Sequence, residues 1–569
     1  MRNGWKLATV WATGMKWNRQ TSIFLFLGIL FNLPLMIPLL PKTIALGWDM
    51  GAHLTRTWAL HQALIDGSFP PRWSSYLAFG YGSPVLMFNW SLPYYLGSLF
   101  IQCGAPLFSA YHGVVAVTII ASFLSMYIFL LYLAPPLWAF IGAIFFSWAP
   151  YRFNVNYLRS AIGENTAVIF WPIIFLSALF LFTKAYRRGF LMGSAAFALC
   201  LISHQVLFLM ILPVFLLFIL LRYVQTKNHT AALLSIGTIL AGLLFTSYFW
   251  IPAFFEKNSI GFSSIQLLYQ SNFLTWKTLV SHPLFAAFGQ EPWLLMYAIG
   301  WPQISVLLFS VTLLVRMLKQ KKSHSTTLIF FFLIVSLGAL FLLTSNSHIF
   351  WDRISFLRMF VYPQRFLGLA TFTISIVAAL TLSGLANKKT YKAIFSVAFV
   401  TVIFFNAPSI MLNRKPQPVN LQQFNTPLLN TTDMTAEFMP NTIPKDFMWN
   451  IGRYEQVPLL SVLSGQATVK HCIQTSSTIS CVIETKTPAS FRLRQFYFPG
   501  WSVFGDNKEL PLRMDQAVGT LVFDVPANTT TITARFGNTP LRTIANSLTF
   551  LSVIVYCVFL LLFSSIKKR

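Results

Sequence analysis

The sequence predicts a polytopic α-helical membrane protein with about 12 transmembrane helices and a C-terminal β-sandwich-like domain outside the membrane. Three observations lead to this class. Hydrophobic residues make up 56% of the 569 residues and charged residues only 10%, whereas soluble proteins carry roughly 25% charged residues. Apolar runs of about 20 residues, the length of a membrane-spanning helix, recur along the chain. Towards the C-terminus the pattern changes to short alternating strands.

The apolar runs define the expected membrane spans. They cover residues 22–40, 111–133, 137–151, 166–183, 189–203, 205–221, 231–252, 294–315, 326–344, 366–385, 393–411 and 544–563. The first run is too long for the apolar part of a signal peptide, and no small-x-small cleavage site follows it, so we expect a retained helix. Residues 84–104 are also apolar, but a crossing there would move every later loop to the other side. We therefore expect this segment at the outer interface, where Trp and Tyr are favoured.

The distribution of charge fixes the expected orientation. The linkers "TKAYRR", "RYVQTKNHT", "RMLKQKKSH" and "NKKTYK" and the final "KKR" contain Lys and Arg but no Asp or Glu. Cytoplasmic loops of membrane proteins are enriched in Lys and Arg. The sequence therefore predicts cytoplasmic N- and C-termini and outward-facing acids. This distribution also explains the net charge of +26 without a nucleic-acid partner.

The pattern divides the chain into three expected parts. Residues 1–412 form a transmembrane domain whose outer loop covers 41–110, residues 413–541 form the outer β-rich domain, and residues 542–569 hold the last helix and a basic tail. Strand signals include "SFRLRQFYF", "TLVFDVP" and "TTITARF", and "GDNKE" is typical of a hairpin turn. Cys472 and Cys481 flank a polar turn, which favours a disulfide on the oxidising side. No cysteine or histidine spacing indicates a dedicated metal site.

Asp49 is the first acid after the first apolar run. It begins an amphipathic stretch in which Leu54, Trp58, His61 and Ile65 share one helical face, so we expect a helix lying in the interface plane. His53 and Arg56 follow Asp49 by four and seven residues and share its side of the helix. Such a carboxylate, imidazole and guanidinium could handle an acceptor hydroxyl and a phosphate. The alternative is that Asp49 only caps the helix.

The other outer-side acids have simpler interpretations beside functional ones. Glu164 occupies a position where the N-terminus of a helix favours a carboxylate. Arg152 and Arg159 nearby either bind a phosphate or pair with acids. Glu256, Asp352 and His204 are expected at loops or helix ends, Asp66 in a helix-ending turn, and Glu291 in a loop.

A long block of the sequence resembles a known family. The block "DMGAHLTRTWALHQALIDGSFPPRWSSYLAFGYGSPVLMFNWSLPYYLG" resembles the first outer loop of the YfhO-like and 6-pyruvoyl-tetrahydropterin synthase-related membrane proteins. These belong to the GT-C class of integral membrane glycosyltransferases. Further similar pieces follow in the expected order: "YLRSAIGENTA", "ISHQ", "YFWIPAFFE", "YPQRFLGLA" and "FYFPGWSV".

The resemblance implies a transferase that moves a sugar from a polyprenyl-phosphate donor to an envelope glycan, lipid or protein on the outer leaflet. It implies catalytic roles for Asp49 and Glu164, with Asp49 as the general base. The residues it implies in substrate binding are His53, Arg56, Arg72, Arg159, His204, Glu256 and Arg365. The second outer loop lacks a DxD or ExD pattern, which leaves a requirement for a divalent cation open.

The resemblance also implies a bacterial cytoplasmic (inner) membrane, and nothing in the chain resembles a soluble pterin enzyme. Two other functional classes stay open at the level of sequence. One is a transporter or flippase of a lipid-linked glycan, and the other is a non-catalytic membrane assembly protein. Transporters usually hold ionisable residues at mid-membrane depth, whereas the predicted spans contain almost no acids.

Overall fold

The computed structural model describes residues 17–40, 47–261, 267–281, 297–318, 324–385, 390–406, 438–443 and 457–566. The chain divides into two discontinuous units by its contacts. Unit 1 is Met1–Met50, His112–Gly242 and Gln266–Val419, and unit 2 is Gly51–Tyr111, Leu243–Ile265 and Asn420–Arg569. The expected domain boundary near residue 412 and the predicted loop charge Glu291 lie outside the described residues.

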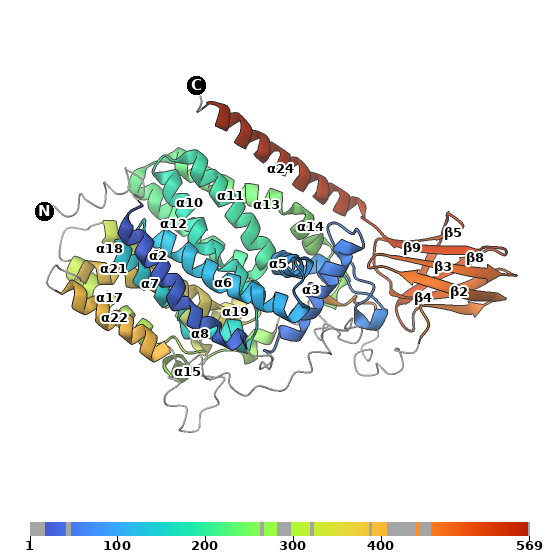
Figure 1. Cartoon of the computed structure of the whole chain (residues 1–569), viewed down its shortest axis with the longest axis horizontal. Coiled ribbons are helices and arrows are strands. Elements are labelled where there is room, and N and C mark those ends of the chain that lie inside the picture. The colour runs from blue at the N-terminus through green and yellow to red at the C-terminus, as the bar shows by residue number, and fades with distance from the viewer. Residues whose placement is uncertain are drawn as a thin grey trace. The chain divides into compact units, whose positions relative to one another are not determined.

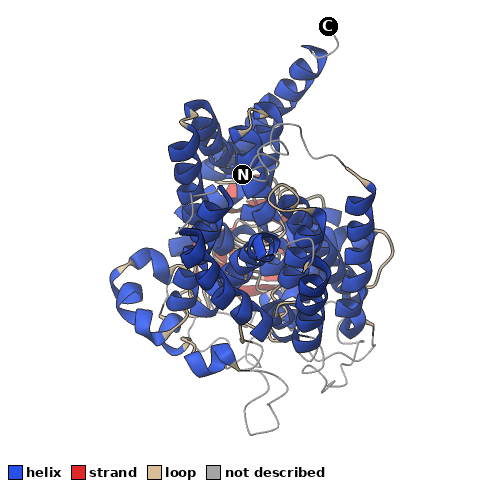
Figure 2. Ribbon diagram, turned by 90° about the vertical axis from the view of Figure 1, so that its left-hand side faces the viewer, coloured by secondary structure: helices blue, strands red, loops and turns tan. Residues whose placement is uncertain are grey.

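Unit 1 consists of helices (Figures 1 and 2). Its longer elements are α2 (Arg19–Asn32), η1 (Leu33–Leu39), most of α6 (Leu107–Leu130), α7 (Pro136–Ser147), α10 (Phe170–Phe182), α11 (Tyr186–Ser203), α12 (Gln205–Thr226), most of α13 (His229–Phe245), α17 (Trp301–Leu318), α18 (His324–Leu342), α21 (Phe366–Leu385) and α22 (Tyr391–Asn406). Shorter ones are α8 (Pro150–Phe153), the π-helical turn η3 (Asn154–Leu158), α9 (Ile162–Ala167), η6 (Leu268–Ser271), α15 (Trp276–Val280), η8 (Ser345–Ser347), α19 (His348–Arg353), α20 (Ser355–Arg358) and η9 (Pro363–Arg365).

The chain is a multi-pass membrane protein. In the described part, six helical segments are long and apolar enough to cross a bilayer: Arg19–Leu39, Leu107–Leu130, Ile162–Phe182, Gln205–Thr226, Pro363–Gly384 and Pro540–Val558. The pair α13 and α14 (Ser247–Phe255), bent by 77°, makes a seventh if it forms one span. Each of the predicted spans contains a helix, but several helices are short, so the count of twelve stays a prediction.

Helix α21 forms the core of unit 1. It is almost entirely buried and packs against α7, α17 and α18. Phe372 on α21 contacts Phe129, Phe175 and Trp171, whose ring centroids lie 5.6–6.5 Å away. In lipid there is no hydrophobic driving force between helices, so packing contacts such as these aromatic pairs hold the helices together. The opposite case is the N-terminal span Arg19–Leu39, which is mostly exposed, as a lipid-facing helix should be.

Unit 2 contains the outer loop, the bent helix and the C-terminal part. Its helices are α3 (Met50–Ile65), η2 (Ala78–Gly80), α4 (Val85–Phe88), α5 (Leu92–Gln102), α14, η4 (Lys257–Ser259) and α24 (Pro540–Ile566). The apolar segment 84–104 forms α4 and α5 with a break between them, and neither helix is long enough to span a bilayer. Its expected position at the outer interface stays a prediction.

Helix α3 forms where the sequence predicts it, and its position in the interface plane stays a prediction. Leu54 is buried as expected, whereas Ile65 is 62% exposed, and the polar side of the helix is buried too. The polar groups are buried because they have partners. His53 Nδ1 lies 3.0 Å from the Tyr94 hydroxyl, and His61 Nδ1 lies 3.0 Å from Ser98 Oγ, both on α5.

The β-rich domain has two antiparallel sheets, as a sandwich-like domain requires (strands in Figure 1). One sheet has the order β1-β4-β8-β7 and the other β2-β3-β9-β5-β6. The strands are β1 (Leu460–Ser464), β2 (Ala467–Gln474), β3 (Thr478–Thr485), β4 (Ala489–Phe496), β5 (Trp501–Gly505), β6 (Lys508–Leu510), β7 (Leu512–Met514), β8 (Thr520–Val525) and β9 (Thr531–Phe536). Burial alternates along β3 and β4, so each buries one face.

Local sequence signals in this domain match the structure. Asp506 and Asn507 both have positive φ (44° and 68°) and join β5 to β6, which confirms the hairpin predicted at "GDNKE". Cys472 and Cys481 face each other across β2 and β3 and form a disulfide. The hairpin tip is tied to the outer loop by Asp66, whose Oδ2 accepts hydrogen bonds from Ser476 N and Oγ at 2.7 and 2.6 Å. Asp66 therefore does more than end a helix.

A buried ion pair joins α14 to α24. Glu256 accepts hydrogen bonds from Arg542 Nε at 3.1 Å and from Nη2 at 2.7 Å. The Arg542 side chain is fully buried and also donates to the Pro499 and Gly537 carbonyls. Arg542 thus fastens the last helix both to α14 and to the chain that leaves the β-rich domain.

We expect Arg542→Met to lower the melting temperature of the purified protein sharply, because it leaves the Glu256 carboxylate without its partner. Breaking one side of a buried pair costs about 3–5 kcal/mol. The matched control is Arg513→Met, since Arg513 pairs with Asp524 on the exposed surface of the β-rich domain and exposed pairs contribute little. Thermal unfolding in detergent measures both variants, and equal shifts would contradict the structural role of Arg542.

Candidate functional site

Glu164 lies in the first turn of α9, just after an irregular stretch of backbone. The turn η3 is π-helical, and Ser160 then takes a left-handed conformation with φ 57°. This break reverses the chain between Arg159 and α9, so that the Arg159 side chain reaches the carboxylate five residues later. π-Helical turns occur frequently at functional sites.

The Glu164 carboxylate is fully occupied by donors from three segments of unit 1. Arg159 binds it with both ends of its guanidinium, Nη1 to Oε2 at 3.0 Å and Nη2 to Oε1 at 2.8 Å. Arg365 Nε donates to Oε1 at 2.9 Å, and the Tyr151 hydroxyl donates to Oε2 at 3.1 Å. A carboxylate has roughly four lone-pair positions, so each oxygen of Glu164 already has two donors.

The surroundings of Glu164 hold more positive than negative charge. Arg152 is 4% exposed, its Nη2 donates to Ser122 Oγ at 3.1 Å, and it forms no ion pair with any described residue. Burial lowers the pKa of Arg152 to about 10, which still leaves it protonated at neutral pH. A narrow cavity borders this group, lined by Phe146, Tyr151, Arg152, Val155, Glu164, Val168, Leu207, Arg365 and Gly368. We name Arg152, Arg159, Arg365 and Glu164 the arginine cluster.

Asp49 is positioned by the same stretch of chain. Its backbone N–H donates to the Arg159 carbonyl at 3.0 Å, and the neighbouring Trp48 N–H donates to the Leu158 carbonyl at 2.9 Å. Asp49 itself is exposed and directly precedes the first residue of α3. The helix-capping alternative fits this position as well as the catalytic one, because the N-cap residue immediately precedes a helix.

His204 adjoins the cluster but serves as a helix cap. Its Nδ1 accepts a hydrogen bond from Leu207 N at 3.3 Å at the start of α12, as the helix-end interpretation predicted. Burial and the charge of Arg365 lower the pKa of this imidazole to about 3. At neutral pH it is an uncharged neighbour of the arginines and no proton donor.

The remaining predicted substrate-binding residues belong to unit 2 and have partners there. His53 contacts Tyr94, and the Arg56 guanidinium lies 5.2 Å from the centre of the Phe438 ring. Arg72 donates to Asn538 and Asn546, and Glu256 holds Arg542. Their roles towards a substrate stay predictions.

Several residues near Glu164 and Glu256 were missed at the level of sequence. Tyr151 and Tyr297 have no local signal, and Arg542 lies in an apolar helix where the sequence indicated only a span. A scan for charged residues at the ends of apolar runs would have found Arg542. In the described part of the chain no group of three or more His, Cys, Asp or Glu gathers as a metal site needs, and a requirement for a divalent cation stays open.

No protein-family model and no curated protein matches the chain, so the family suggested by the sequence stays a prediction. Distant likenesses exist among solved structures. Arabinofuranosyltransferase AftD from Mycobacteria has a TM-score of 0.46 and 12% identity over 89% of this chain, which spans 40% of that protein. The Archaeoglobus fulgidus oligosaccharyltransferase has a TM-score of 0.36 and 14% identity, covering 71% of this chain and 56% of its own.

A third likeness is ArnT from Cupriavidus metallidurans bound to undecaprenyl phosphate. Its TM-score is 0.30 and its identity 10%, with 88% of this chain and 97% of that chain covered. Likenesses this distant establish neither the fold nor the activity of this chain.

We expect Glu164→Gln to destabilise the protein strongly, because the Arg159 and Arg365 guanidiniums then lose the carboxylate they pair with. Removing one of them in the double variant Glu164→Gln, Arg159→Gln should restore part of the lost melting temperature, since fewer unpaired charges stay buried. Glu484→Gln, which removes an exposed partner of Lys470, is the control and should change little. A double variant no more stable than Glu164→Gln would show that the pair does not stabilise the fold through its charge.

Proposed function

We propose that this protein is an integral membrane glycosyltransferase of the GT-C class that its sequence resembles. It transfers a sugar from a polyprenyl-phosphate donor to a hydroxyl of an envelope glycan, lipid or protein at the outer leaflet. One observation carries the proposal. In unit 1, the exposed residue Asp49 donates a backbone hydrogen bond to the Arg159 carbonyl. Arg159 belongs to the arginine cluster, which holds more positive than negative charge.

The arginine cluster suits the phosphate of the donor. The Arg152 and Arg365 side chains line a cavity of only about 10 Å³, with apolar neighbours such as Phe146 and Val168, so the proposal requires the cavity to widen when a phosphate binds. Guanidinium groups bind phosphate oxygens with paired hydrogen bonds, and these strengthen where water is excluded. As the bond between the anomeric carbon and the phosphate oxygen breaks, negative charge grows on that oxygen, and the arginines stabilise it without having to reorganise.

Asp49 is the general base of the proposed reaction. The acceptor hydroxyl oxygen attacks the anomeric carbon and its proton passes to the Asp49 carboxylate, while the polyprenyl phosphate departs with the bonding electron pair. The new glycosidic bond replaces the sugar–phosphate bond, so atoms and charge balance. The exposure of Asp49 supports this role, because a general base must come within hydrogen-bond distance of the acceptor.

For Glu164 we propose a positioning role in place of the catalytic role expected from the sequence. Four hydrogen bonds already fill its lone-pair positions, so no lone pair is left to accept a substrate proton. Its negative charge instead holds Arg159 and Arg365 in fixed directions. Pre-oriented cations of this kind are what phosphate departure requires.

A transporter of a lipid-linked glycan is the second candidate, and two observations favour it. The pair α13 and α14 is bent by 77°, and broken helices mark the binding sites of many transporters. Glu164 also lies inside the candidate span Ile162–Phe182, whereas the sequence placed the start of that span at residue 166. A transporter, however, has no need of an exposed carboxylate as a base.

We expect Asp49→Asn to reduce transfer about 10²–10⁴-fold, the usual contribution of a general base, while the protein still inserts in the membrane. Mass spectrometry of envelope glycans and polyprenyl-linked sugars compares cells with wild type, no protein, Asp49→Asn or the control Asp524→Asn at matched protein levels. The donor should accumulate with Asp49→Asn and not with Asp524→Asn, an exposed acid of the β-rich domain. Normal glycans with Asp49→Asn would show that Asp49 only caps α3 and would favour transport.

We expect Arg152→Gln to raise the donor KM at least several-fold with a smaller loss of thermal stability than Glu164→Gln. Arg152 touches no carboxylate, so removing its charge leaves the Glu164 ion pairs intact. Arg152→Lys should recover part of the affinity, since lysine keeps the positive charge but lacks the paired N–H donors of a guanidinium. The KM of each variant is measured by varying the concentration of the donor that the glycan comparison identifies. An unchanged KM in Arg152→Gln would show that Arg152 does not bind the phosphate.

A further inference from the structure

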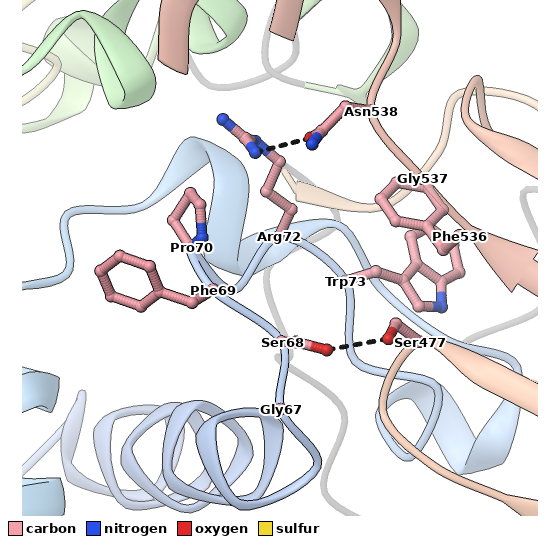
Figure 3. Close-up of a pocket in the computed structure, with 10 residues that line it drawn as sticks. All are labelled: Gly67, Ser68, Phe69, Pro70, Arg72, Trp73, Ser477, Phe536, Gly537 and Asn538. Atoms are coloured by element: carbon pink, nitrogen blue, oxygen red, sulfur yellow. Dashed lines mark hydrogen bonds between the residues drawn. The ribbon is translucent and has the colours of Figure 1, made fainter. Parts of the chain in front are cut away.

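Unit 2 contains a cavity of about 240 Å³ that the transferase proposal does not use. One wall is the loop that follows α3, and the other is the edge of the β-rich domain where β9 ends (Figure 3). Its lining is Gly67, Ser68, Phe69, Pro70, Arg72, Trp73, Ser477, Phe536, Gly537 and Asn538. A hydrogen bond of 2.8 Å between the Ser68 and Ser477 hydroxyls closes one end.

Arg72 gives this cavity a buried positive charge that forms no ion pair with a described acid. The side chain is 6% exposed and donates only to neutral oxygens: Asn538 Oδ1 at 2.8 Å, Asn546 Oδ1 at 2.7 Å and the Tyr248 carbonyl at 3.0 Å. It makes no ion pair with a residue that the structure describes, because the nearby Glu256 is held by Arg542. A buried charge without a partner is costly, and an anionic ligand would remove that cost.

The charge state and the geometry of Arg72 both suit an anion. Burial, followed by the nearby charge of Arg542, lowers the pKa of Arg72 to about 10, so it is protonated at neutral pH. A guanidinium has five N–H donors. Nε–H and one Nη1–H of Arg72 have no acceptor among the described residues. They lie on different edges of the guanidinium, so each can donate a single hydrogen bond to an oxyanion.

The rest of the lining suits a sugar ring better than a bare ion. Trp73 stacks on Phe536 with ring centroids 5.0 Å apart and an angle of 27°, which forms an aromatic wall. Phe69 lines the rim of the cavity and is 80% exposed, so its ring is open to a ligand. The Ser68 and Ser477 hydroxyls and the Asn538 amide add hydrogen-bonding groups of the kind that orient a ligand in such a pocket.

We propose that this cavity binds an acidic saccharide unit, with its carboxylate on Arg72 and its ring against Phe69 and the aromatic wall. The lining shares no residue with the arginine cluster, and the proposal does not depend on the proposed transfer reaction. Sugar recognition here would let the β-rich domain hold an acidic glycan.

The test is equilibrium dialysis of the purified full-length protein in detergent with radiolabelled glucuronate. Unlabelled glucose, acetate and inorganic phosphate serve as competitors. Glucuronate should bind, and glucose and acetate should compete at least about 10-fold more weakly, because each keeps only the ring contacts or only the charge contact. Phosphate competing as well as glucuronate would overturn the saccharide assignment, as would equal competition by glucose or no glucuronate binding.

Substitutions of residues that line the cavity test whether glucuronate binds there. Arg72→Met should weaken glucuronate binding at least about 10-fold, with Arg72→Lys in between. Because Arg72 also holds α24 through Asn546, the melting temperature of each variant is measured as well. Phe69→Ala changes an exposed side chain and should weaken binding without a change in melting temperature. Arg513→Met, on the exposed surface, is the matched control and should bind normally.

Two outcomes separate this proposal from the transferase proposal. Asp49→Asn should bind glucuronate as wild type does, since Asp49 is not part of the cavity. If Asp49→Asn loses transfer and keeps glucuronate binding, both proposals are supported. If Phe69→Ala and a folded Arg72→Met bind glucuronate as well as wild type, the saccharide site is wrong while the transferase proposal is unaffected.

Discussion

The buried Glu164 carboxylate is the constraint on which the organisation of unit 1 depends. A charge inside a membrane protein is tolerated only when its hydrogen-bonding capacity is satisfied, and Glu164 meets this condition with donors from the segments that carry Tyr151, Arg159 and Arg365. The left-handed Ser160 and the π-helical turn before it are the backbone features that let Arg159 turn back on the acid. Asp49 is fastened to the same stretch through the Arg159 carbonyl. The interaction that stabilises the fold is therefore also the one that positions the candidate site.

Features set by local sequence could be predicted. Each apolar run contains a helix, the alternating segments near the C-terminus are strands, and the hairpin at Asp506 and Asn507 forms where its turn residues indicate. These succeed because periodicity and turn chemistry act over a few residues. The helix α3 was also predicted, but its exposure was not. A hydrophobic face can be read from spacing, whereas the burial of its polar face depends on partners such as Tyr94 and Ser98 on another helix.

The pairing of charges could not be predicted, because it joins residues far apart in the chain. Arg365 lies 201 residues from Glu164, and Arg542 lies 286 residues from Glu256. Nothing within a window around either acid indicates its partner, and a single arginine at the end of an apolar run fits lipid phosphate, an acid or a carbonyl equally well. Sequence alone therefore named Asp49 and Glu164 as candidate site residues and gave Glu164 a catalytic role. Its four hydrogen bonds are what now favour a positioning role.

Five of the described arginines fall into two chemical situations, and the contrast bears on function. Arg159, Arg365 and Arg542 have carboxylate partners and stabilise the fold. Arg152 and Arg72 have only neutral partners, yet each lines a cavity. An uncompensated buried charge is unfavourable unless a ligand supplies the missing anion. The two cavities differ in their linings, and the proposed ligands differ accordingly. Apolar groups around Arg152 suit the phosphate of a lipid, whereas hydroxyl, amide and aromatic groups around Arg72 suit an acidic sugar. In the two proposals, each of these arginines therefore binds a different anion.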